Sequence, residues 1–466
     1  MPLLIKHGRV ITATDDYTAD IYCQGETISR IEPTIDPRTL PDGRADLEII
    51  DASGKYVFPG FIDPHVHIYL PFMGTYAVDD YESASRAALA GGTTTLIEMI
   101  CPGPTDQPFE AFETWRSKAR DLAAVDYTFH MSVVRFEQEI RDQFRKIVES
   151  GVPSFKVFLA YKGALDLSDE NLFAMMKMAK ELGVIVTAHC ENAEAIDALQ
   201  KALLAEGKTG TEWHEPSRPP VVEAEGVHHL CTFAELTGAH VYTVHTSCDL
   251  AMREALAARH RGVNVWIEVV APHLVLDATY AERPDFEGAK YVMSPPLRAK
   301  WNQDVLWNGL RSRAISTVGT DHAPFNFRGQ KEMGRDAFTT IPNGIPTIQE
   351  RVDLVHTYGV GEGRLGLMAM VDACSTQAAR IFGMYPRKGT IQVGSDADLV
   401  VYDPEYRGTF SHATSFSKVD YNAYEGWEKK GRASAVTVRG QVQVRDGKFV
   451  GTIGRGEVSA REPTHP

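Results

Sequence analysis

The sequence has few cysteines for its length, and no pair of them is spaced as in a zinc-binding or redox motif. The six cysteines are scattered through 466 residues and never form a Cys-x-x-Cys pair. This usage is typical of reduced, mostly buried thiols, and it argues against a disulfide framework or a zinc ribbon. A metal in this protein would therefore need ligands other than cysteine.

Long apolar runs and clusters of basic residues are also missing. The N-terminal run Leu3–Ile5 is too short for the apolar core of a secretory signal, and no stretch of about 18 apolar residues follows that could span a bilayer. Acidic residues outnumber Lys and Arg by 62 to 48, and the formal net charge is −14, which argues against nucleic-acid binding. We therefore expect a cytoplasmic protein that acts on a small neutral substrate, without nucleic-acid or membrane partners.

The pattern of strand and helix signals changes twice along the chain. Short β-branched segments separated by Gly, Asp and Pro turns occupy residues 1–57 and return in residues 386–450. Between them, over residues 58–385, apolar runs alternate with amphipathic stretches, which indicates parallel strands joined by crossover helices. This length favours a closed (β/α)8 TIM barrel. An open doubly wound sheet would need a Gly-rich phosphate loop, and the sequence has none.

Neither terminal segment has enough strands to pair all of its own edges. We therefore expect residues 1–57 and 386–450 to build one small β-sandwich domain together, beside the barrel of residues 58–385. The pair Asp446-Gly447 predicts a hairpin turn in the second segment. Residues 451–466 should form a C-terminal tail, because their last part is polar with two prolines, and we expect it to be disordered or to lie over a neighbouring subunit.

Polar side chains follow several apolar runs of the barrel region. His65 and His67 close the first run, and their spacing places them on the same side of a strand. His189, His245 and Asp321 follow three later runs. Because the C-terminal ends of barrel strands meet at one mouth, we expect these five side chains to converge there. Imidazole and carboxylate ligands suit Zn²⁺ and its first-row neighbours, so the pattern predicts a metal site.

Each of these residues has an ordinary structural explanation when it is taken alone. A single histidine at a strand end is more often a hydrogen-bonded core residue than a ligand, whereas the five positions together share a geometry that chance rarely gives. His322 follows Asp321 and should point the other way, so we assign it no ligand role. The other histidines in or beside expected helices and turns are interpreted as structural or surface residues: His228, His229, His240, His260, His273 and His356.

A lysine stands inside an apolar run that should be the interior of a strand. Lys156 lies in Ser154–Ala160, where an ammonium group costs several kcal/mol unless it is neutralised, paired or chemically changed. Addition of CO₂ to the neutral amine gives a carbamate, an anion with two oxygens that can bridge two cations. Two divalent ions close together need such a bridging anion, and an unmodified lysine would add a further positive charge. The sequence therefore predicts a CO₂-derived carbamate on Lys156.

A series of motifs in fixed order resembles the dihydropyrimidinase and D-hydantoinase family of cyclic amidohydrolases over essentially the whole chain. The motifs are Pro59–His67, Gly91–Thr94, Phe155–Lys162, His189–Asn192, Ser294–Arg298, Gly319–His322, Ile341–Gly344, Pro386–Gly389 and Gly394–Asp398. The resemblance implies two divalent ions per subunit, with Zn²⁺ as the expected metal, and a homotetramer. It implies one ligand set of His65, His67 and Asp321, a second of His189 and His245, and N6-carboxylated Lys156 bound to both ions.

The same resemblance implies roles in catalysis and substrate binding. Tyr161 would stabilise the developing oxyanion, and one such donor is typically worth about 10²- to 10³-fold in rate. Main-chain groups of Ser294 and Asn343 would hold the ring amide and imide, and Asp321 would carry a proton from the nucleophile to the leaving ring nitrogen. The expected reaction is hydrolysis of the ring amide of dihydropyrimidines or 5-substituted hydantoins to N-carbamoyl amino acids.

Three alternatives stay open beside this prediction. Dihydroorotase-like chains typically have His-x-His-x-Arg, but Tyr69 stands at the place of that arginine, so an anionic ring would lack its partner. Allantoinase is disfavoured by the Tyr161 and Ser294 motifs. A non-catalytic scaffold relative would have lost ligand positions that are all filled here. The segments Glu98–Ile100 and Glu268–His273 depart from the family pattern, and we expect them to affect the pocket for the exocyclic substituent.

Overall fold

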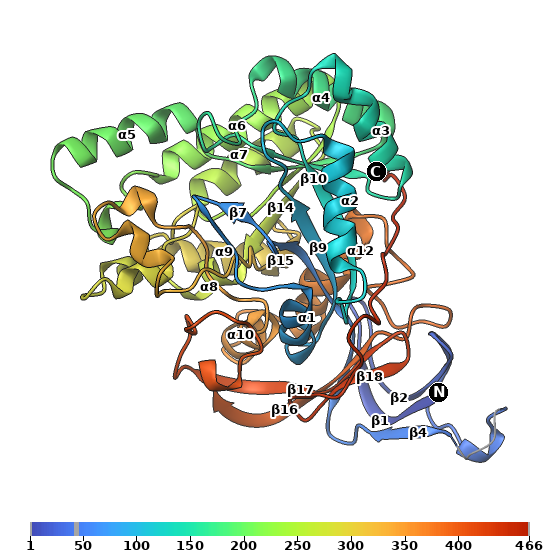
Figure 1. The fold of residues 1–466 in the computed structure, drawn as a ribbon. Coiled ribbons are helices and arrows are strands. Elements are labelled where there is room, and N and C mark those ends of the chain that lie inside the picture. Colours follow the sequence, from blue (N-terminus) through green and yellow to red (C-terminus); the bar gives the residue numbers. More distant parts are fainter. Residues whose placement is uncertain (1, 42–45, 465–466) are drawn as a thin grey trace.

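The computed structural model describes residues 2–41 and 46–464. Its centre is an eight-stranded sheet of parallel strands in the order β15-β14-β13-β12-β11-β10-β9-β6, surrounded by helices (Figure 1). This arrangement confirms the predicted (β/α)8 barrel. The barrel strands are β6 (Phe61–Val66), β9 (Thr93–Ile100), β10 (Asp126–Ser132), β11 (Ser154–Phe158), β12 (Ile185–His189), β13 (His240–Thr243), β14 (Val265–Val270) and β15 (Thr317–Gly319).

Some helices between the strands begin and end with recognisable capping signals, as α4 (Asp169–Leu182) does. The Ser168 side chain accepts a hydrogen bond from the Asn171 main chain at the start of one helix, and Gly183 ends that helix with a φ of 67°. No helix in the described part of the chain is long and apolar enough to cross a membrane. The α-helices are α1 (Tyr81–Ala90), α2 (Pro108–Ala119), α3 (Arg141–Glu149), α4 (Asp169–Leu182), α5 (Ala193–Ala205), α6 (Pro220–Thr237), α7 (Asp249–His260), α8 (Ala271–Val275), α9 (Trp301–Arg311), α10 (Arg351–Leu354), α11 (Leu367–Val371) and α12 (Gln377–Ile381).

Shorter elements complete the barrel mouth and the connections. A small hairpin of β7 (Pro71–Phe72) and β8 (Thr75–Tyr76) follows the first barrel strand. Two π-helical segments, η8 (Val355–Val360) and η9 (Asp372–Thr376), continue α10 and join α11 to α12. The 3-10 segments are η1 (Pro37–Thr39), η2 (Gln138–Ile140), η3 (Thr211–Trp213), η4 (Ala278–Glu282), η5 (Glu287–Tyr291), η6 (Lys331–Gly334), η7 (Phe338–Thr340) and η10 (His412–Thr414).

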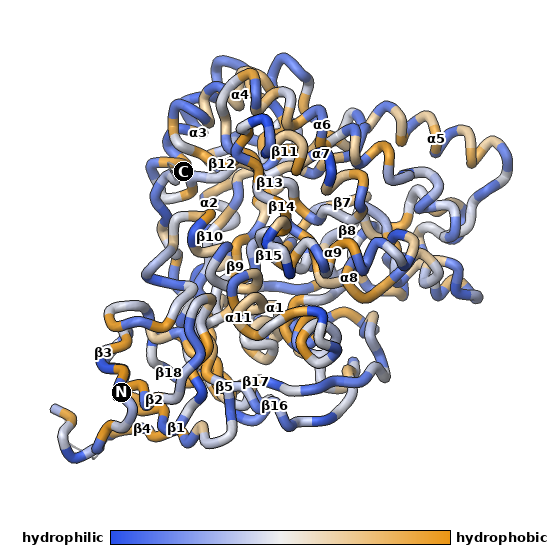
Figure 2. The backbone as a smooth tube through the Cα atoms, turned by 180° about the vertical axis from the view of Figure 1, so that it is seen from behind, coloured by the Kyte–Doolittle hydropathy of each residue, from blue (hydrophilic) through white to orange (hydrophobic). Residues whose placement is uncertain are grey.

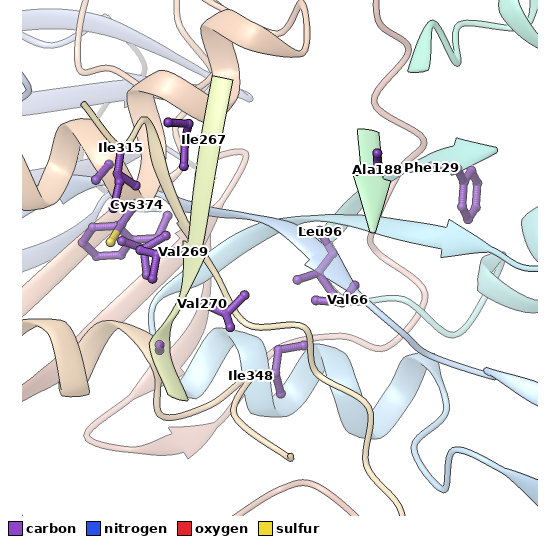
Figure 3. Close-up of a cluster of buried hydrophobic side chains, with 14 of the residues drawn as sticks. Val66, Leu96, Phe129, Ala188, Ile267, Val269, Val270, Ile315, Ile348 and Cys374 are labelled. Carbon is purple, nitrogen blue, oxygen red and sulfur yellow. The ribbon is translucent and has the colours of Figure 1, made fainter. Parts of the chain in front are cut away.

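Alternation along the barrel strands divides the core into two clusters. On β9, Leu96 joins the cluster shared with the helices, whereas Ile97 joins a smaller cluster with residues of other barrel strands. Figure 3 shows part of the first cluster, and Figure 2 shows hydrophobic residues gathered along the central strands. On β11, Phe155 and Val157 belong to the cluster shared with the helices. Lys156 lies between them in the strand and therefore faces the opposite side, toward the barrel interior.

The barrel closes without a strand ladder between β15 and β6 in the described residues. The fully buried guanidinium of Arg351, at the start of α10, donates to the carbonyl oxygens of Ile62 on β6 (2.8 Å) and Val318 on β15 (2.7 Å). Just beyond these positions, the main-chain N–H of Asp321 donates to the His65 carbonyl at 2.9 Å. This seam therefore brings the end of the last strand next to the end of the first.

Both termini contribute to a second, nine-stranded mixed sheet, as predicted (Figure 1). The two parts meet at β5, where Val57 is paired with Val10 on one side and with Val401 on the other. The predicted Asp446-Gly447 turn joins the last two strands, and both residues have positive φ, as a tight hairpin turn requires. The strands are β1 (Leu3–Ile11), β2 (Asp16–Gln24), β3 (Thr27–Glu32), β4 (Glu48–Asp51), β5 (Tyr56–Pro59), β16 (Leu399–Thr409), β17 (Glu428–Val438), β18 (Gln441–Arg445) and β19 (Lys448–Phe449).

The C-terminal segment lies along its own barrel, so the expectation of a disordered tail is wrong for residues 451–464. On β10, only the last two residues pair with β11, and Val458 forms a parallel bridge to Tyr127 near the start of β10. The buried side chain of Arg461 donates to Thr128 Oγ1 (3.1 Å) and Ser154 Oγ (2.8 Å). The tail is ordered because the open half of β10 satisfies its main chain, although its own sequence has no strand pattern.

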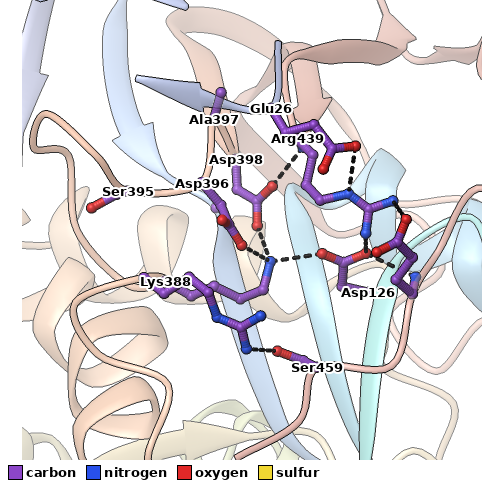
Figure 4. A network of polar contacts seen from close by, with 12 residues as sticks. Glu26, Asp126, Lys388, Ser395, Asp396, Ala397, Asp398, Arg439 and Ser459 are labelled. Carbon is purple, nitrogen blue, oxygen red and sulfur yellow. Dashed lines mark hydrogen bonds and ion pairs between the residues drawn. The ribbon is translucent and has the colours of Figure 1, made fainter. Parts of the chain in front are cut away.

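A buried ionic cluster joins the barrel to the terminal sheet (Figure 4). Lys388 Nζ lies 2.7 Å from Asp126 on β10, 2.7 Å from Asp398 and 3.0 Å from Asp396. Arg439, in the turn directly after β17, also contacts Asp126, at 2.7 Å. The three carboxylates could form a cation site by their spacing, but the Lys388 ammonium already lies among them. Burial alone would lower the pKa of Lys388, but the effect of the nearby carboxylates is larger and holds this pKa well above its ordinary value.

We predict that Lys388→Met destabilises the protein strongly. The substitution leaves buried carboxylates without their shared cation, and breaking a buried pair in this way typically costs about 3–5 kcal/mol of unfolding free energy. Denaturant unfolding of the variant should show this loss. The matched control is Lys448→Met, because Lys448 is exposed on β19 and should change stability by less than about 0.5 kcal/mol. Equal stability of the two variants would contradict a structural role for the cluster.

Candidate metal centre

The residues singled out in the sequence converge at the C-terminal end of the barrel. His65 and Lys156 lie within strands, His189 ends β12, and His245 and Asp321 follow β13 and β15 by two residues. The cavity at this mouth is lined by all nine of the predicted site residues: His65, His67, Lys156, Tyr161, His189, His245, Ser294, Asp321 and Asn343. The geometry that the strand-end argument predicts is therefore present.

Three ligand-type atoms form a compact group on one side of the cavity. Asp321 Oδ1 lies 3.1 Å from both His65 Nε2 and His67 Nε2, and the two imidazole nitrogens are 3.3 Å apart. Burial opposes ionisation of Asp321, but the charges and hydrogen bonds of the two histidines outweigh it and hold its pKa well below the usual range. A carboxylate and two imidazoles at this spacing are suited to one divalent ion.

His189, His245 and Lys156 lie on the other side of the cavity. The ring centroids of His189 and His245 are 4.5 Å apart, and those of His245 and His65 are 5.4 Å apart, so the two groups are neighbours. Lys156 is fully buried, and its Nζ has no hydrogen-bond partner among the described residues. Burial lowers its pKa to about 8, against the attraction of Asp321 and Glu268. A neutral amine is therefore accessible at this position near neutral pH.

Two buried glutamates contact the histidines, and neither was predicted as a site residue. Glu268 on β14 contacts His65 Nδ1 and the His245 main-chain N–H, both at 2.8 Å. Glu191 Oε2 lies 2.6 Å from His189 Nε2. Such carboxylates fix the orientation of a ligating imidazole and leave its other nitrogen for the metal. Glu191 follows the end of β12 by two residues and Glu268 lies inside β14, so their positions alone do not mark them as partners of the histidines.

The two segments that depart from the family pattern make their contacts beside the cavities and not in the lining. No residue of Glu98–Ile100 or Glu268–His273 lines the metal cavity or the adjoining one among the described residues. Glu98 contacts Tyr81 instead, and His273 contacts the Pro295 carbonyl. Their effect on the pocket for an exocyclic group therefore stays a prediction, and it would have to act through neighbouring residues.

His322 is turned away from the cavity although it is adjacent to Asp321 in sequence. Its Nε2 lies 2.9 Å from Asp79 Oδ2, and its Nδ1 accepts from the Thr347 main-chain N–H at 3.1 Å. These contacts hold the segment that leads to α10. His322 is therefore part of the scaffold around the site and supplies no ligand atom to the cavity.

Tyr161 and the Ser294–Asn343 pair lie at the opening of the cavity. The Tyr161 ring centroid is 5.3 Å from that of His189, and burial raises the Tyr161 pKa to about 12, so the phenol stays protonated. Asn343 Nδ2 donates to Ser294 Oγ at 2.8 Å. Tyr161 also has a positive φ of 64°, and Asp321 has one of 51°. Strained residues of this kind are common at functional sites, where the surrounding structure over-determines them.

Comparison with known proteins agrees with this geometry. The amidohydrolase family matches residues 56–443. The chain is 44% identical to a D-hydantoinase of Geobacillus stearothermophilus over 99% of this chain and 97% of that one. It is 37% identical to a dihydropyrimidinase of Rattus norvegicus over 99% of this chain and 89% of that one.

Solved structures of such proteins superpose closely on this one. A D-hydantoinase (dihydropyrimidinase) from Thermus sp. has a TM-score of 0.96 and 57% identity, covering 99% of both chains. An L-hydantoinase (dihydropyrimidinase) from Arthrobacter aurescens has a TM-score of 0.89 and 28% identity, covering 98% of this chain and 99% of that one. These findings confirm the resemblance seen in the sequence. The chain belongs to the hydantoinase and dihydropyrimidinase group of the amidohydrolase family.

Proposed function

We propose that this protein hydrolyses the ring amide of dihydropyrimidines or 5-substituted hydantoins to N-carbamoyl amino acids. The observation that carries the proposal is the convergence of four histidines, Asp321 and the unpartnered amine of Lys156 in one buried cavity beside Tyr161. The similarity to D-hydantoinases and dihydropyrimidinases supports the same substrate class. The six buried free cysteines support a cytoplasmic location, and the family resemblance supports a homotetramer.

The donor atoms of the cavity fit two divalent ions, and we propose Zn²⁺. One ion would be held by His65, His67 and Asp321, and the other by His189 and His245. A carbamate on Lys156 would bind both ions. The fit is supported by buried ligand-type atoms that have no hydrogen-bond partner among the described residues, Lys156 Nζ and His245 Nδ1. Bound at this mouth, two such ions would supply an activated water near neutral pH and polarise the ring carbonyl.

Asp321 is suited to move the proton that ring opening requires. A carboxyl group is ordinarily ionised at neutral pH, so Asp321 can accept the proton released when water adds to the ring carbonyl carbon. Collapse of the tetrahedral intermediate breaks the C–N bond, and Asp321 returns that proton to the departing ring nitrogen. The added water oxygen stays in the new carboxyl group, which releases the second water proton to solvent, and Asp321 is regenerated.

Tyr161 and the opposite side of the opening position the substrate. The protonated phenol of Tyr161 can donate a hydrogen bond to the oxyanion that develops on the attacked carbonyl. We propose that main-chain groups at Ser294 and Asn343 hold the ring amide and imide. A second cavity adjoins the opening and is lined by apolar side chains that include Phe72, Leu165 and Ile196. It offers space for an apolar group at ring position 5.

A substrate comparison tests the proposed function. Purified protein should turn over dihydrouracil and 5-phenylhydantoin, because both present a neutral ring amide and imide. It should not turn over dihydroorotate at a comparable rate, because Tyr69 replaces the expected arginine and packs against Tyr81, with ring centroids 6.0 Å apart. Allantoin should be assayed alongside, because it is the neutral ring substrate of the allantoinase alternative. Preferential turnover of dihydroorotate or allantoin would contradict the proposal.

We predict that Lys156→Ala removes both bound metal and activity. Without the amine no carbamate can form, and two divalent ions would then lack their bridging anion. Elemental analysis after expression with ample CO₂ should show a large loss of divalent metal, and turnover should fall below detection while the fold is kept. Lys177→Ala, at an exposed position on α4, is the matched control and should keep both. Full activity of Lys156→Ala would refute the carbamate role.

We predict that Tyr161→Phe lowers kcat by about 10²- to 10³-fold, the usual effect of removing one oxyanion donor. Metal content and KM should stay close to those of the unchanged protein, because the phenyl ring keeps the packing around His189. Steady-state kinetics with elemental analysis of the same preparation would check this. A kcat within about threefold of the original value would mean that another group stabilises the oxyanion.

A further inference from the structure

The segments around Ser294 and Asn343, which we propose hold the substrate ring, are held by main-chain hydrogen bonds at positions next to these two residues but not at the two residues themselves. The Val292 carbonyl accepts from the Gly344 main-chain N–H at 2.9 Å, and the Met293 carbonyl lies 2.7 Å from His214 Nε2. In contrast, no hydrogen bond among the described residues uses the main-chain N–H or carbonyl of Ser294 or Asn343. The segments therefore present free main-chain groups from an otherwise fixed frame.

One buried lysine contacts both segments. Lys331, the first residue of η6, donates from Nζ to the carbonyl of Val292 (3.1 Å) and to the carbonyl of Pro342 (3.0 Å). Val292 stands two residues before Ser294, and Pro342 directly precedes Asn343. The ammonium thus ties the segment that carries one side of the ring-binding pair to the segment that carries the other.

The electrostatic setting of Lys331 is unusual for a residue with only a packing role. Its side chain is fully buried, and no carboxylate in the described part of the chain lies within ion-pair distance of Nζ. Burial lowers its pKa to about 7. A buried cation without a counter-charge costs free energy, and an apolar side chain of similar volume would be cheaper to bury. The two carbonyl contacts are what Lys331 provides and an apolar residue cannot.

We propose that Lys331 is a positioning residue that sets the spacing between the Ser294 and Asn343 main-chain groups, and so the fit of the substrate ring. Two carbonyl oxygens drawn to one ammonium fix the distance between their segments. Without the ammonium, the carbonyl dipoles lose their shared partner and the segments can separate. This role rests on the proposed function, because it concerns the ring amide and imide that these main-chain groups would bind.

The test is the kinetics of Lys331→Met and Lys331→Gln, measured on the metal-loaded enzyme. Methionine keeps the length and volume of the side chain and removes both donors, whereas glutamine keeps a donor. The Ser294 and Asn343 main-chain groups would contact the ring amide and imide that both substrates have. Lys331→Met should therefore raise KM about tenfold or more for both dihydrouracil and 5-phenylhydantoin, a size expected when binding groups are misplaced. We expect kcat to change by less than about threefold, metal content to stay unchanged, and Lys331→Gln to give an intermediate KM.

The control is Lys290→Met on η5, a lysine near the same segment that pairs with Glu287 and contacts no part of the cavity. It should keep the original KM. A folded Lys331→Met or Lys331→Gln variant with unchanged KM would overturn the positioning role while leaving the proposed function intact. Failure of both variants to fold would also contradict it, because Lys331 would then be a structural residue. Absence of turnover in the unsubstituted protein would overturn the proposed function and this role with it.

Discussion

The organisation of the site depends on how the protein accommodates the amine of Lys156 inside the barrel. The alternation of β11 turns this side chain inward, where it is fully buried and has no hydrogen-bond partner among the described residues. Burial lowers its pKa, which makes the neutral, CO₂-reactive amine accessible. Four imidazoles and Asp321 surround the same cavity. A carbamate at this position would convert an unfavourable buried cation into the anion that two divalent ions require.

The ligands around Lys156 are held by contacts outside the cavity. Arg351 closes the barrel seam, so Asp321 comes beside His65 although more than 250 residues separate them in the chain. Glu268 and Glu191 then orient His65 and His189 through their second ring nitrogens. Gly319 allows the first of these contacts, because a Cβ there would lie 3.0 Å from the Glu268 carboxyl group. The fold thus supplies preorganised ligands from strands that are distant in sequence.

The sequence predicted the barrel and the convergence of the site because both follow from periodicities. The spacing of His65 and His67 and the apolar run around Lys156 specify strands, and strand ends in a barrel must meet. Glu191 and Glu268 were not assigned roles, because their importance depends on which ring nitrogen they contact. Lys331 was missed since its two partners are distant loops, and the order of the C-terminal tail was missed since it depends on an unpaired half of β10. These contacts are properties of tertiary packing that no local pattern encodes.

The central claim is that Lys156 carries a carbamate shared by two divalent ions. The most direct measurement is ¹³C NMR of the metal-loaded protein prepared with ¹³C-labelled bicarbonate, read together with its elemental analysis. The account predicts one labelled carbamate carbon per chain, two divalent ions per chain, and loss of the labelled signal when the metals are removed and the protein is kept without CO₂. Two tightly bound ions and full turnover in a protein that contains no labelled carbamate would contradict it.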